Sequence, residues 1–313
     1  MENILTVKDL SKTYKNGRKA LDRLNFQVEK GEILGFLGPN GAGKSTTINI
    51  LSTLLKADEG KLTYFGDEGL SLKRIKQSLG IVPQELAIYE EISAYQNVKF
   101  FASLYGVKKA EMKDKVDNAL RKVGLEERKH DKAATFSGGM KRRLNIACAI
   151  AHDPQLIIFD EPTVGIDPQS RNHILDSIKS LRAEGATIIY TTHYMEEVQQ
   201  ICDRVIIMDG GVVLLNDRLD NILDDYSDAS YQISLNQPMS KDLLDKIRQL
   251  PHVLTADQDS DLHLNLTMKK TGTSLNAVLS LLLQSHIAIS GIQTKKKNLE
   301  DVFLSLTGKR LRD

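Results

Sequence analysis

One stretch of nine residues limits the possible folds of this chain more than any other: Gly38, Pro39, Asn40, Gly41, Ala42, Gly43, Lys44, Ser45 and Thr46. Its spacing matches the phosphate-binding loop, whose backbone N–H groups form a concave nest around phosphate oxygens. Lys44 would reach the β- and γ-phosphates of a nucleotide, and the Ser45 hydroxyl would hold Mg²⁺. A glycine-rich turn with a chance lysine is the alternative interpretation.

The flanking residues favour phosphate binding. Residues 32–37 are predicted to form a buried strand, and residues 45–55 are predicted to form the helix that follows. A bound anion would lie at the N-terminus of that helix, where unpaired N–H groups and the helix dipole favour negative charge. Upstream, Tyr14 lies in the polar segment 11–17. It is either a stacking partner for adenine or an ordinary surface tyrosine.

A second chemical feature is a run of four apolar residues, 156–159, followed by Asp160 and Glu161. An entirely apolar strand is typical of the middle of a parallel sheet, and ligands bind at the carboxyl ends of such strands. We expect Asp160 to contact Mg²⁺ through water. Glu161 would polarise the water that attacks the γ-phosphate. Two acids that merely cap a strand are the alternative.

Two other predicted strands also end at polar side chains. The strand predicted in the segment 79–84 ends at Gln84, whose amide could reach Mg²⁺ or the attacking water, although one glutamine in a loop is weak evidence. The buried strand over residues 186–191 ends close to His193. Alone, such a histidine is more often structural. Beside the phosphate loop and the acidic pair, we interpret it as a hydrogen-bond partner of the γ-phosphate.

Ser137, Gly138 and Gly139 indicate a second anion site, separate from the phosphate loop. Ser137 is suited to cap a helix that continues to Ala151, and the two glycines leave backbone N–H groups uncovered. An ordinary serine-capped basic helix is the alternative. That alternative does not explain why two adjacent glycines weaken the first turn of the helix.

The order of the predicted elements divides the chain into two domains. Residues 1–217 alternate strands and helices, which indicates an α/β phosphate-loop NTPase core, with a helical subdomain inserted at about 86–152. Residues 218–313 follow the order β-α-β-β-α-β, which is typical of a small ferredoxin-like α+β domain. The second domain shows no catalytic constellation, so a role in regulation or dimerisation rests on analogy between folds.

Composition narrows the classes of partner. The 313 residues include 42 basic and 41 acidic side chains, and this balance argues against a dedicated nucleic-acid-binding protein. The N-terminus lacks the features of a signal peptide, and no apolar run approaches the ~20 residues of a membrane-spanning helix. We therefore expect a cytoplasmic protein in which Cys148 and Cys202 are inert core thiols. The histidines show no zinc-ligand spacing.

Five elements in one order resemble the ATP-binding cassette (ABC) family of transporter ATPases: GPNGAGKST, Gln84, FSGGM, LIIFDEP and His193. The resemblance covers about residues 1–217. The FSGGM signature makes it specific, because phosphate loops alone are widespread. The signature departs from the usual form, which begins with leucine and ends with glutamine, since Phe136 and Met140 stand at those positions.

The resemblance implies roles that the residues alone leave open. Tyr14 would stack on adenine, Gln84 would couple the nucleotide to a membrane partner, and Asp167 would take part in communication across a dimer. The serine and glycines of FSGGM would contact the γ-phosphate of ATP held by a second copy of the chain. A symmetric dimer would then close on two ATP molecules.

Residues 136–140, 163–168 and 298–303 look most like exporter ATPases whose permease is a separate polypeptide. The resemblance therefore implies an ATPase that powers export through an integral membrane permease. The chain would sit on the inner face of the cell membrane, docked through helices near 91–105. One alternative is an ABC ATPase acting on the ribosome or DNA, although such chains usually carry two cassettes or a long coiled coil. A phosphate-loop kinase ranks last, because FSGGM and Glu161 would have no role there.

Overall fold

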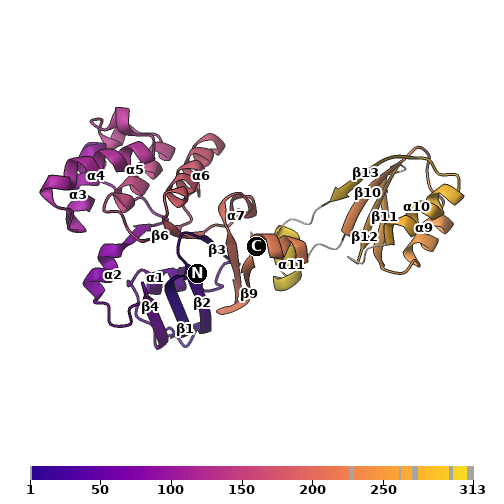
Figure 1. Ribbon diagram of the computed structural model, residues 1–313, viewed down its shortest axis with the longest axis horizontal. Coiled ribbons are helices and arrows are strands. Elements are labelled where there is room, and N and C mark those ends of the chain that lie inside the picture. Colours follow the sequence, from indigo (N-terminus) through magenta and orange to yellow (C-terminus); the bar gives the residue numbers. More distant parts are fainter. Residues whose placement is uncertain (1, 226–228, 261, 270–273, 296–298, 309–313) are drawn as a thin grey trace. The chain divides into compact units, whose positions relative to one another are not determined.

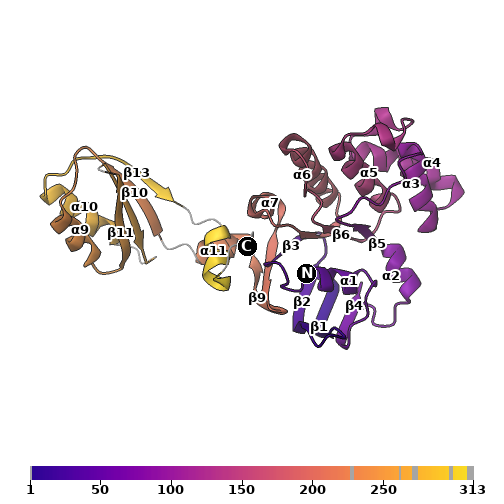
Figure 2. The same cartoon turned by 180° about the vertical axis from the view of Figure 1, so that it is seen from behind.

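The computed structural model describes residues 2–225, 229–260, 262–269, 274–295 and 299–308. The chain divides into two compact units, one over Met1–Leu219 together with the residues from Thr307 onward, and one over Asp220–Leu306 (Figures 1 and 2). Among the described residues, none of the helices combines the length and apolar character needed to cross a bilayer. The first unit contains every residue assigned above to nucleotide chemistry.

A six-stranded sheet with the order β5-β6-β7-β3-β8-β9 forms the centre of the first unit. Its strands are β3 (Ile33–Leu37), β5 (Leu79–Val82), β6 (Leu156–Asp160), β7 (Thr187–Thr191), β8 (Arg204–Asp209) and β9 (Val212–Arg218). The strands from β5 to β8 in this order are parallel, and β9 pairs antiparallel with β8. Both β3 and β7 are buried along their whole length, as expected for apolar runs inside a parallel sheet.

A three-stranded antiparallel sheet shares a core with the central sheet. Its order is β2-β1-β4, with β1 (Asn3–Thr13), β2 (Lys19–Glu29) and β4 (Glu59–Tyr64). The rings of Phe26 in β2 and Phe36 in β3 pack edge to face with centroids 5.1 Å apart. Helix α1 (Lys44–Leu51) adds Ile48 and Leu51 to the same core. Helix α2 (Leu72–Ser78) follows β4 and leads into β5.

The inserted subdomain consists of α3 (Ala94–Leu104), α4 (Lys109–Lys122) and α5 (Gly138–Ile150), with short 3-10 helices at Glu126–Arg128 and Ala133–Thr135. In Figure 1 these helices form the group in magenta tones. Ser93 and Gln96 form a reciprocal capping box at the start of α3. At the start of α5, the Ser137 hydroxyl accepts a hydrogen bond from the N–H of Met140 at 3.3 Å. Local sequence therefore sets both helix starts.

Helix α6 (Pro168–Ala183) follows β6, and α7 (Met195–Ile201) follows β7. The Asp167 carboxylate caps α6 by accepting the N–H of Ser170 at 2.9 Å. Pro168 occupies the first turn, where its missing N–H costs nothing. These features give α6 a well-defined start close to the end of β6.

The second unit has the predicted ferredoxin-like arrangement. Its elements are β10 (Ala229–Leu235), α9 (Lys241–Arg248), β11 (Val253–Ser260), β12 (His263–Met268), α10 (Ser274–Gln284) and β13 (Ile289–Lys295). The strands form one antiparallel sheet in the order β11-β12-β10-β13. Ile233 and Leu264 of the sheet are buried with Leu243 and Val278 of the two helices. Helices α8 (Leu219–Asp225) and α11 (Leu299–Thr307) precede and follow these elements in the chain.

Several element boundaries differ from the prediction. The seven-residue helices α2 and α7 have no predicted counterpart, because so short a segment carries little periodic signal. Helix α1 ends at Leu51 rather than at residue 55, and Thr53 adopts a positive φ of 63° that a helix cannot continue through. Strand β1 ends at Thr13 and β2 begins at Lys19, so Tyr14 lies in the short connection between them. Asn298 of the C-terminal motif lies outside the described residues.

Candidate functional site

The phosphate loop forms the turn between β3 and α1. Gly41 and Gly43 have φ values of +82° and +107°, a left-handed backbone that glycine adopts without steric cost. Position 38 requires glycine for a different reason, because a Cβ there would lie only 2.4 Å from the backbone oxygen of Met208. Pro39, Asn40 and Ala42 complete the loop. Its glycines are therefore dictated by the loop conformation and its close packing.

Lys44, the first residue of α1, is only 6% exposed. Its Nζ donates hydrogen bonds to the carbonyl oxygens of Gly38 at 2.6 Å and Pro39 at 3.2 Å. Burial lowers the pKa of the Lys44 ammonium, and the negative charges of Glu161 and Asp160 oppose this change. A cation held at the loop and facing two carboxylates is well suited to bind phosphate oxygens.

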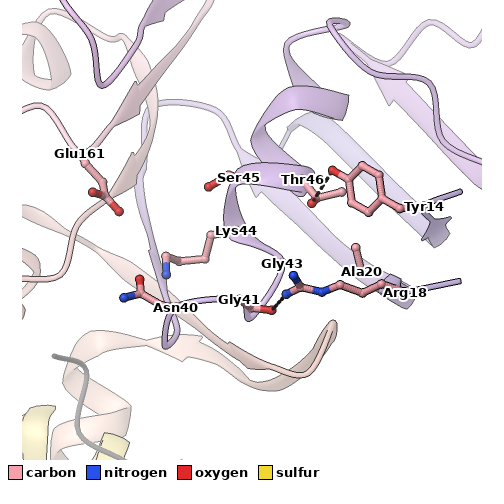
Figure 3. Close-up of a pocket in the computed structure, with 10 residues that line it drawn as sticks. All are labelled: Tyr14, Arg18, Ala20, Asn40, Gly41, Gly43, Lys44, Ser45, Thr46 and Glu161. Carbon is pink, nitrogen blue, oxygen red and sulfur yellow. Dashed lines mark hydrogen bonds between the residues drawn. The ribbon is translucent and has the colours of Figure 1, made fainter. Parts of the chain in front are cut away.

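A cavity of about 330 Å³ opens over the loop and the first turn of α1 (Figure 3). It is lined by Tyr14, Arg18, Ala20, Asn40, Gly41, Gly43, Lys44, Ser45, Thr46 and Glu161. The Tyr14 hydroxyl lies 3.1 Å from Oγ1 of Thr46, and Tyr14 as a whole is 39% exposed beside the cavity. All the lining residues except Arg18 and Ala20 belong to the predicted site.

Arg18 is a lining residue that sequence reasoning missed. Its guanidinium donates a hydrogen bond to the carbonyl oxygen of Gly41 at 3.2 Å (Figure 3). The bond connects the start of β2 to the phosphate loop and brings a positive charge to the cavity wall. The sequence placed Arg18 only four residues after Tyr14, and that closeness was the one indication that it could reach the nucleotide. It was not distinctive, because Arg18 is one of 42 basic residues.

The two acids at the end of β6 have different surroundings. Asp160 accepts a hydrogen bond from the Thr191 hydroxyl at 2.8 Å, and burial raises the pKa of Asp160 against the effect of this bond. Glu161 has a φ of 50°, which is uncommon for a residue with a side chain. Its N–H donates to the backbone oxygen of Thr191 at 3.1 Å and to Oγ1 at 3.0 Å. Thr191 therefore holds both acids from the neighbouring strand β7.

His193 reaches Glu161 from the end of β7. Its Nε2 lies 2.5 Å from a carboxylate oxygen of Glu161, and the two side chains are 25% and 11% exposed. The other ring nitrogen, Nδ1, is buried and has no hydrogen-bond partner among the described residues. Glu161 also lines the cavity, across from Lys44 (Figure 3). Its contact with His193 therefore puts an imidazole beside a carboxylate at the cavity wall.

The side chains near the loop suit Mg²⁺ by their chemistry. Ser45 offers a hydroxyl oxygen and Asp160 a carboxylate, and Mg²⁺ takes oxygen ligands while keeping several waters and phosphate oxygens. Within the described part of the chain, no group of three or more His, Cys, Asp or Glu side chains could hold a metal ion unaided. The donor set fits a metal bound together with nucleotide better than a metal held by protein alone.

Other predicted site residues are not part of the cavity lining: Gln84, Ser137, Gly138, Gly139 and Asp167. At the start of α5, Ser137 and Gly138 are exposed, and nothing lies within 4 Å of a Cβ built on Gly138. Gly139 is buried, and a Cβ there would lie 2.2 Å from Oγ of Ser170 in α6. The signature therefore packs on α6 at one side and is open at the other.

Gln84 is exposed just beyond β5, and α5 holds its backbone. Arg142 of α5 is 5% exposed, and its guanidinium donates to the carbonyl oxygens of Pro83, at 2.8 Å, and of Gln84. Sequence reasoning missed Arg142, because one of two adjacent arginines in a basic helix looks like part of a solvated face. The signature helix and the Gln84 loop are thus directly connected.

Comparison with known proteins identifies the family. The family described as "ABC transporter" matches residues 21–164. The linearmycin resistance ATP-binding protein LnrL of Bacillus subtilis (strain 168) is 41% identical over 314 residues, covering 99% of this chain and 100% of LnrL. The chain belongs to the ABC transporter family.

Two other comparisons place this ABC transporter protein among ATP-binding subunits. The Nod factor export ATP-binding protein I of Sinorhizobium fredii (strain NBRC 101917 / NGR234) is 33% identical, covering 97% of this chain and 86% of that protein. The solved dimer of the ATP-binding cassette MJ0796, in a post-hydrolysis state with ADP and Pi, has a TM-score of 0.61 and 27% identity. The match covers 69% of this chain and 98% of that one. The predicted NTPase fold and the predicted ATPase class are confirmed.

Proposed function

We propose that this ABC ATPase is the nucleotide-binding subunit of an exporter. Two copies would close on two ATP molecules, and hydrolysis would drive transport through a separate integral membrane permease. The observation that carries the proposal is the open start of α5. Ser137 and Gly138 present a helix N-terminus that favours an anion, yet they do not line the cavity of their own chain. Each chain therefore carries two half-sites that a second copy would complete.

A two-fold arrangement supplies the missing halves symmetrically. The phosphate loop of one copy would face the Ser137 turn of the other, and the same contact would repeat on the opposite side. The structural neighbour MJ0796 is a dimer bound to ADP and Pi. In this chain the turn at Asp167 adjoins the signature, since Gly139 packs on Ser170 of α6. We assign Asp167 to communication between the two sites on this basis.

The chemical roles follow from the positions of the side chains. Tyr14 would stack on adenine, and Lys44 would bind the β- and γ-phosphates. Ser45 and, through water, Asp160 would hold Mg²⁺, with Gln84 reaching the same region. The metal would neutralise charge that develops on the phosphate oxygens.

Glu161 and His193 are assigned to the hydrolysis step itself. Glu161 would polarise the attacking water and accept its proton, as a carboxylate general base does. His193 would hydrogen-bond the γ-phosphate and hold Glu161 in place, since their side chains are 2.5 Å apart. The chain supplies its general base and its phosphate contact from adjacent strands.

An apolar groove between α2 and α3 is the surface we assign to the permease. It is lined by Leu72, Lys73, Lys76, Gln77, Phe101, Leu104 and Tyr105. Leu72 is 64% and Leu104 65% exposed. Exposure of these apolar side chains to water is unfavourable in free energy, and a docked apolar segment would bury them. The two lysines at the rim favour an acidic flank on that segment. Docking here would place the chain on the cytoplasmic face of the membrane.

The rival function is an ABC ATPase acting on the ribosome or DNA. Against it, the formal charge of +1 gives no basic excess for a nucleic-acid partner. The names of the relatives LnrL and Nod factor export protein I refer to resistance and to export. We infer an exported cargo of unspecified chemistry, because the residues that would contact cargo lie on the permease.

Affinity purification of the tagged chain from solubilised membranes separates these functions. The transport function predicts recovery of a stoichiometric protein with several membrane spans, and addition of ATP to the complex should stimulate phosphate release. Recovery of ribosomes or nucleic acid, without any membrane protein, would favour the rival. A gene for a multi-span protein beside the coding sequence would be independent support.

A further inference from the structure

The buried carboxylate of Glu197 has no assigned role in the hydrolysis step, although it lies only four residues after His193. Glu197 in α7 is 2% exposed. Its Oε2 accepts hydrogen bonds from the hydroxyls of Tyr190, at 2.9 Å, and Thr192, at 2.6 Å. These donors offset part of the cost of burying a charge. Burial and the nearby Glu197 charge raise the pKa of Tyr190 far above its ordinary value, so the phenol remains a donor.

The Glu197 contacts fix the turn that carries His193. Thr192 precedes His193, and its Oγ1 both donates to Glu197 and accepts the N–H of Tyr194 at 3.0 Å. The backbone on both sides of His193 is therefore tied to one buried side chain. Tyr190 lies in β7 and is fully buried, which anchors the same carboxylate to the sheet.

The second carboxylate oxygen faces helix α6. Nε of Arg171 lies 3.5 Å from Oε1 of Glu197. Neither atom has a hydrogen-bond partner among the described residues. The guanidinium carbon of Arg171 also lies 4.3 Å from the centre of the Tyr194 ring, within the range of a cation–π contact. Arg171 thus contacts both Glu197 and the residue that follows His193.

Arg171 belongs to the first turn of α6, which has contacts on two sides. Its own N–H donates to the backbone oxygen of Asp167 at 2.9 Å. The preceding residue, Ser170, packs against Gly139 of the signature. One helical turn therefore contacts the His193 turn through Arg171 and the start of α5 through Ser170.

We propose that Glu197 and Arg171 form a positioning pair that holds His193 against Glu161 and links it to the first turn of α6. The pair acts through His193 and does not touch the nucleotide. This inference rests on the proposed function, in which the turn at Asp167 faces the second copy. Closure of the dimer would then favour the hydrolytic orientation of His193, because the contact between Arg171 and the buried Glu197 carboxylate joins α6 to the His193 turn.

The variant Glu197→Gln isolates the link to α6. The amide can keep an oxygen toward Tyr190 and Thr192, but it then turns an NH₂ group toward the Arg171 guanidinium. The matched control is Glu196→Gln, because Glu196 is exposed on the same helix. In the full chain, Glu197→Gln should lower kcat for ATP hydrolysis about tenfold, with calorimetric ATP affinity changed by less than about threefold. The control should match wild type.

A double-mutant cycle tests whether the effect passes through His193. In a His193→Ala background, whose residual hydrolysis is measured at high enzyme concentration, Glu197→Gln should cause no further loss of kcat. A further loss of the same size would overturn the proposal. So would a lowered melting temperature with an unchanged kcat, which would indicate an ion pair that only stabilises the fold.

A second route to the same answer uses Arg171, whose side chain is 25% exposed and easier to replace. Arg171→Gln should lower kcat and show the same non-additivity with His193→Ala, and Arg171→Lys should recover part of the loss by restoring the charge. Additive effects would contradict the proposal even if Glu197→Gln failed to fold. If the wild-type chain did not hydrolyse ATP at all, the proposed function would fail first, which is a separate result.

Discussion

Nε2 of His193 and a carboxylate oxygen of Glu161 lie 2.5 Å apart, at the ends of the neighbouring strands β7 and β6. The phosphate loop follows β3. Strand β7 lies between β6 and β3 and pairs with both. Parallel strands present their carboxyl ends at the same edge of a sheet. The strand order therefore assembles the loop, the acids and the imidazole from segments far apart in the chain.

Replacement of Glu161 by Gln should stop turnover and leave ATP binding intact. An amide cannot accept the proton of the attacking water, whereas Lys44 and Ser45 are unchanged. We expect kcat for phosphate release to fall ~10²- to 10⁴-fold. With saturating ATP, a sizing column should show a dimer, since hydrolysis no longer separates the copies. A monomer under those conditions would contradict the proposed dimer.

Replacement of Lys44 by Ala should abolish measurable nucleotide affinity. Its buried ammonium is the charge assigned to the β- and γ-phosphates, and an alanine removes that charge from the loop. Isothermal calorimetry with ATP is the measurement. Lys15→Ala, at an exposed position near Tyr14, is the control and should bind normally. Unaltered binding by Lys44→Ala would refute the assigned role of the loop.

Gly138 offers a clean test of the signature. Because nothing lies within 4 Å of a Cβ there, both Gly138→Ala and Gly138→Asp should fold and bind ATP. The carboxylate of Gly138→Asp should repel the γ-phosphate presented by a second copy, so dimer formation and hydrolysis should be lost. Gly138→Ala should retain much of both. Equal hydrolysis by the two variants would exclude a phosphate contact at this turn.

Acid should destabilise the first unit through His152. The His152 ring stacks on Tyr105 with centroids 3.9 Å apart, and its Nε2 lies 3.0 Å from the Leu79 carbonyl oxygen. Burial lowers the pKa of His152 from 6.5 to about 4. Between these values the unfolded chain binds more protons, so the free energy of unfolding falls as pH falls, by roughly 3 kcal/mol.

His152→Phe provides the comparison for this pH effect. The variant keeps an aromatic ring against Tyr105 but cannot take up a proton. Urea unfolding at pH 7 and pH 4 should therefore show a smaller loss of unfolding free energy in the variant than in wild type. Equal losses would show that other groups account for the acid sensitivity.

A chain that ends at Leu219 should bind ATP with an unchanged Kd. Every lining residue of the cavity precedes that point, and β9 closes the central sheet at Arg218. Calorimetry on the shortened chain, with circular dichroism to verify that it folds, is the measurement. Loss of affinity in a folded product would reject the assignment of residues 1–217 and 218–313 to separate domains.

Local signals explain what the sequence alone could predict. The phosphate loop, the Ser137 cap and the Asp167 cap are each encoded within a few consecutive residues. The apolar run ahead of Asp160 likewise marks a buried strand by itself. Strand order could not be read from such signals, but parallel strand ends meet at one edge, so the co-location of Lys44 and Glu161 was predictable.

Contacts between distant segments explain what the sequence could not predict. Arg18, Arg142 and Glu197 each contact at least one residue more than 20 positions away in the chain. Charged side chains in amphipathic segments usually face solvent, so their sequence gives no sign of these contacts. Glu197 and Glu196 are adjacent and chemically identical, yet one is 2% exposed and the other is on the surface. Only the packing of α7 on β7 and α6 distinguishes them.

Arg142 has a mechanical consequence. The buried Arg142 guanidinium donates to the carbonyl oxygens of both Pro83 and Gln84. If β5 and α5 moved relative to each other, this charged group would lose its hydrogen-bond acceptors while it remained buried. That penalty is on the order of 1–3 kcal/mol or more. The three-helix subdomain should therefore rotate as a rigid body about the Gln84 loop. A movement of the permease at the groove between α2 and α3 would then be transmitted to the nucleotide as a displacement of the Gln84 loop.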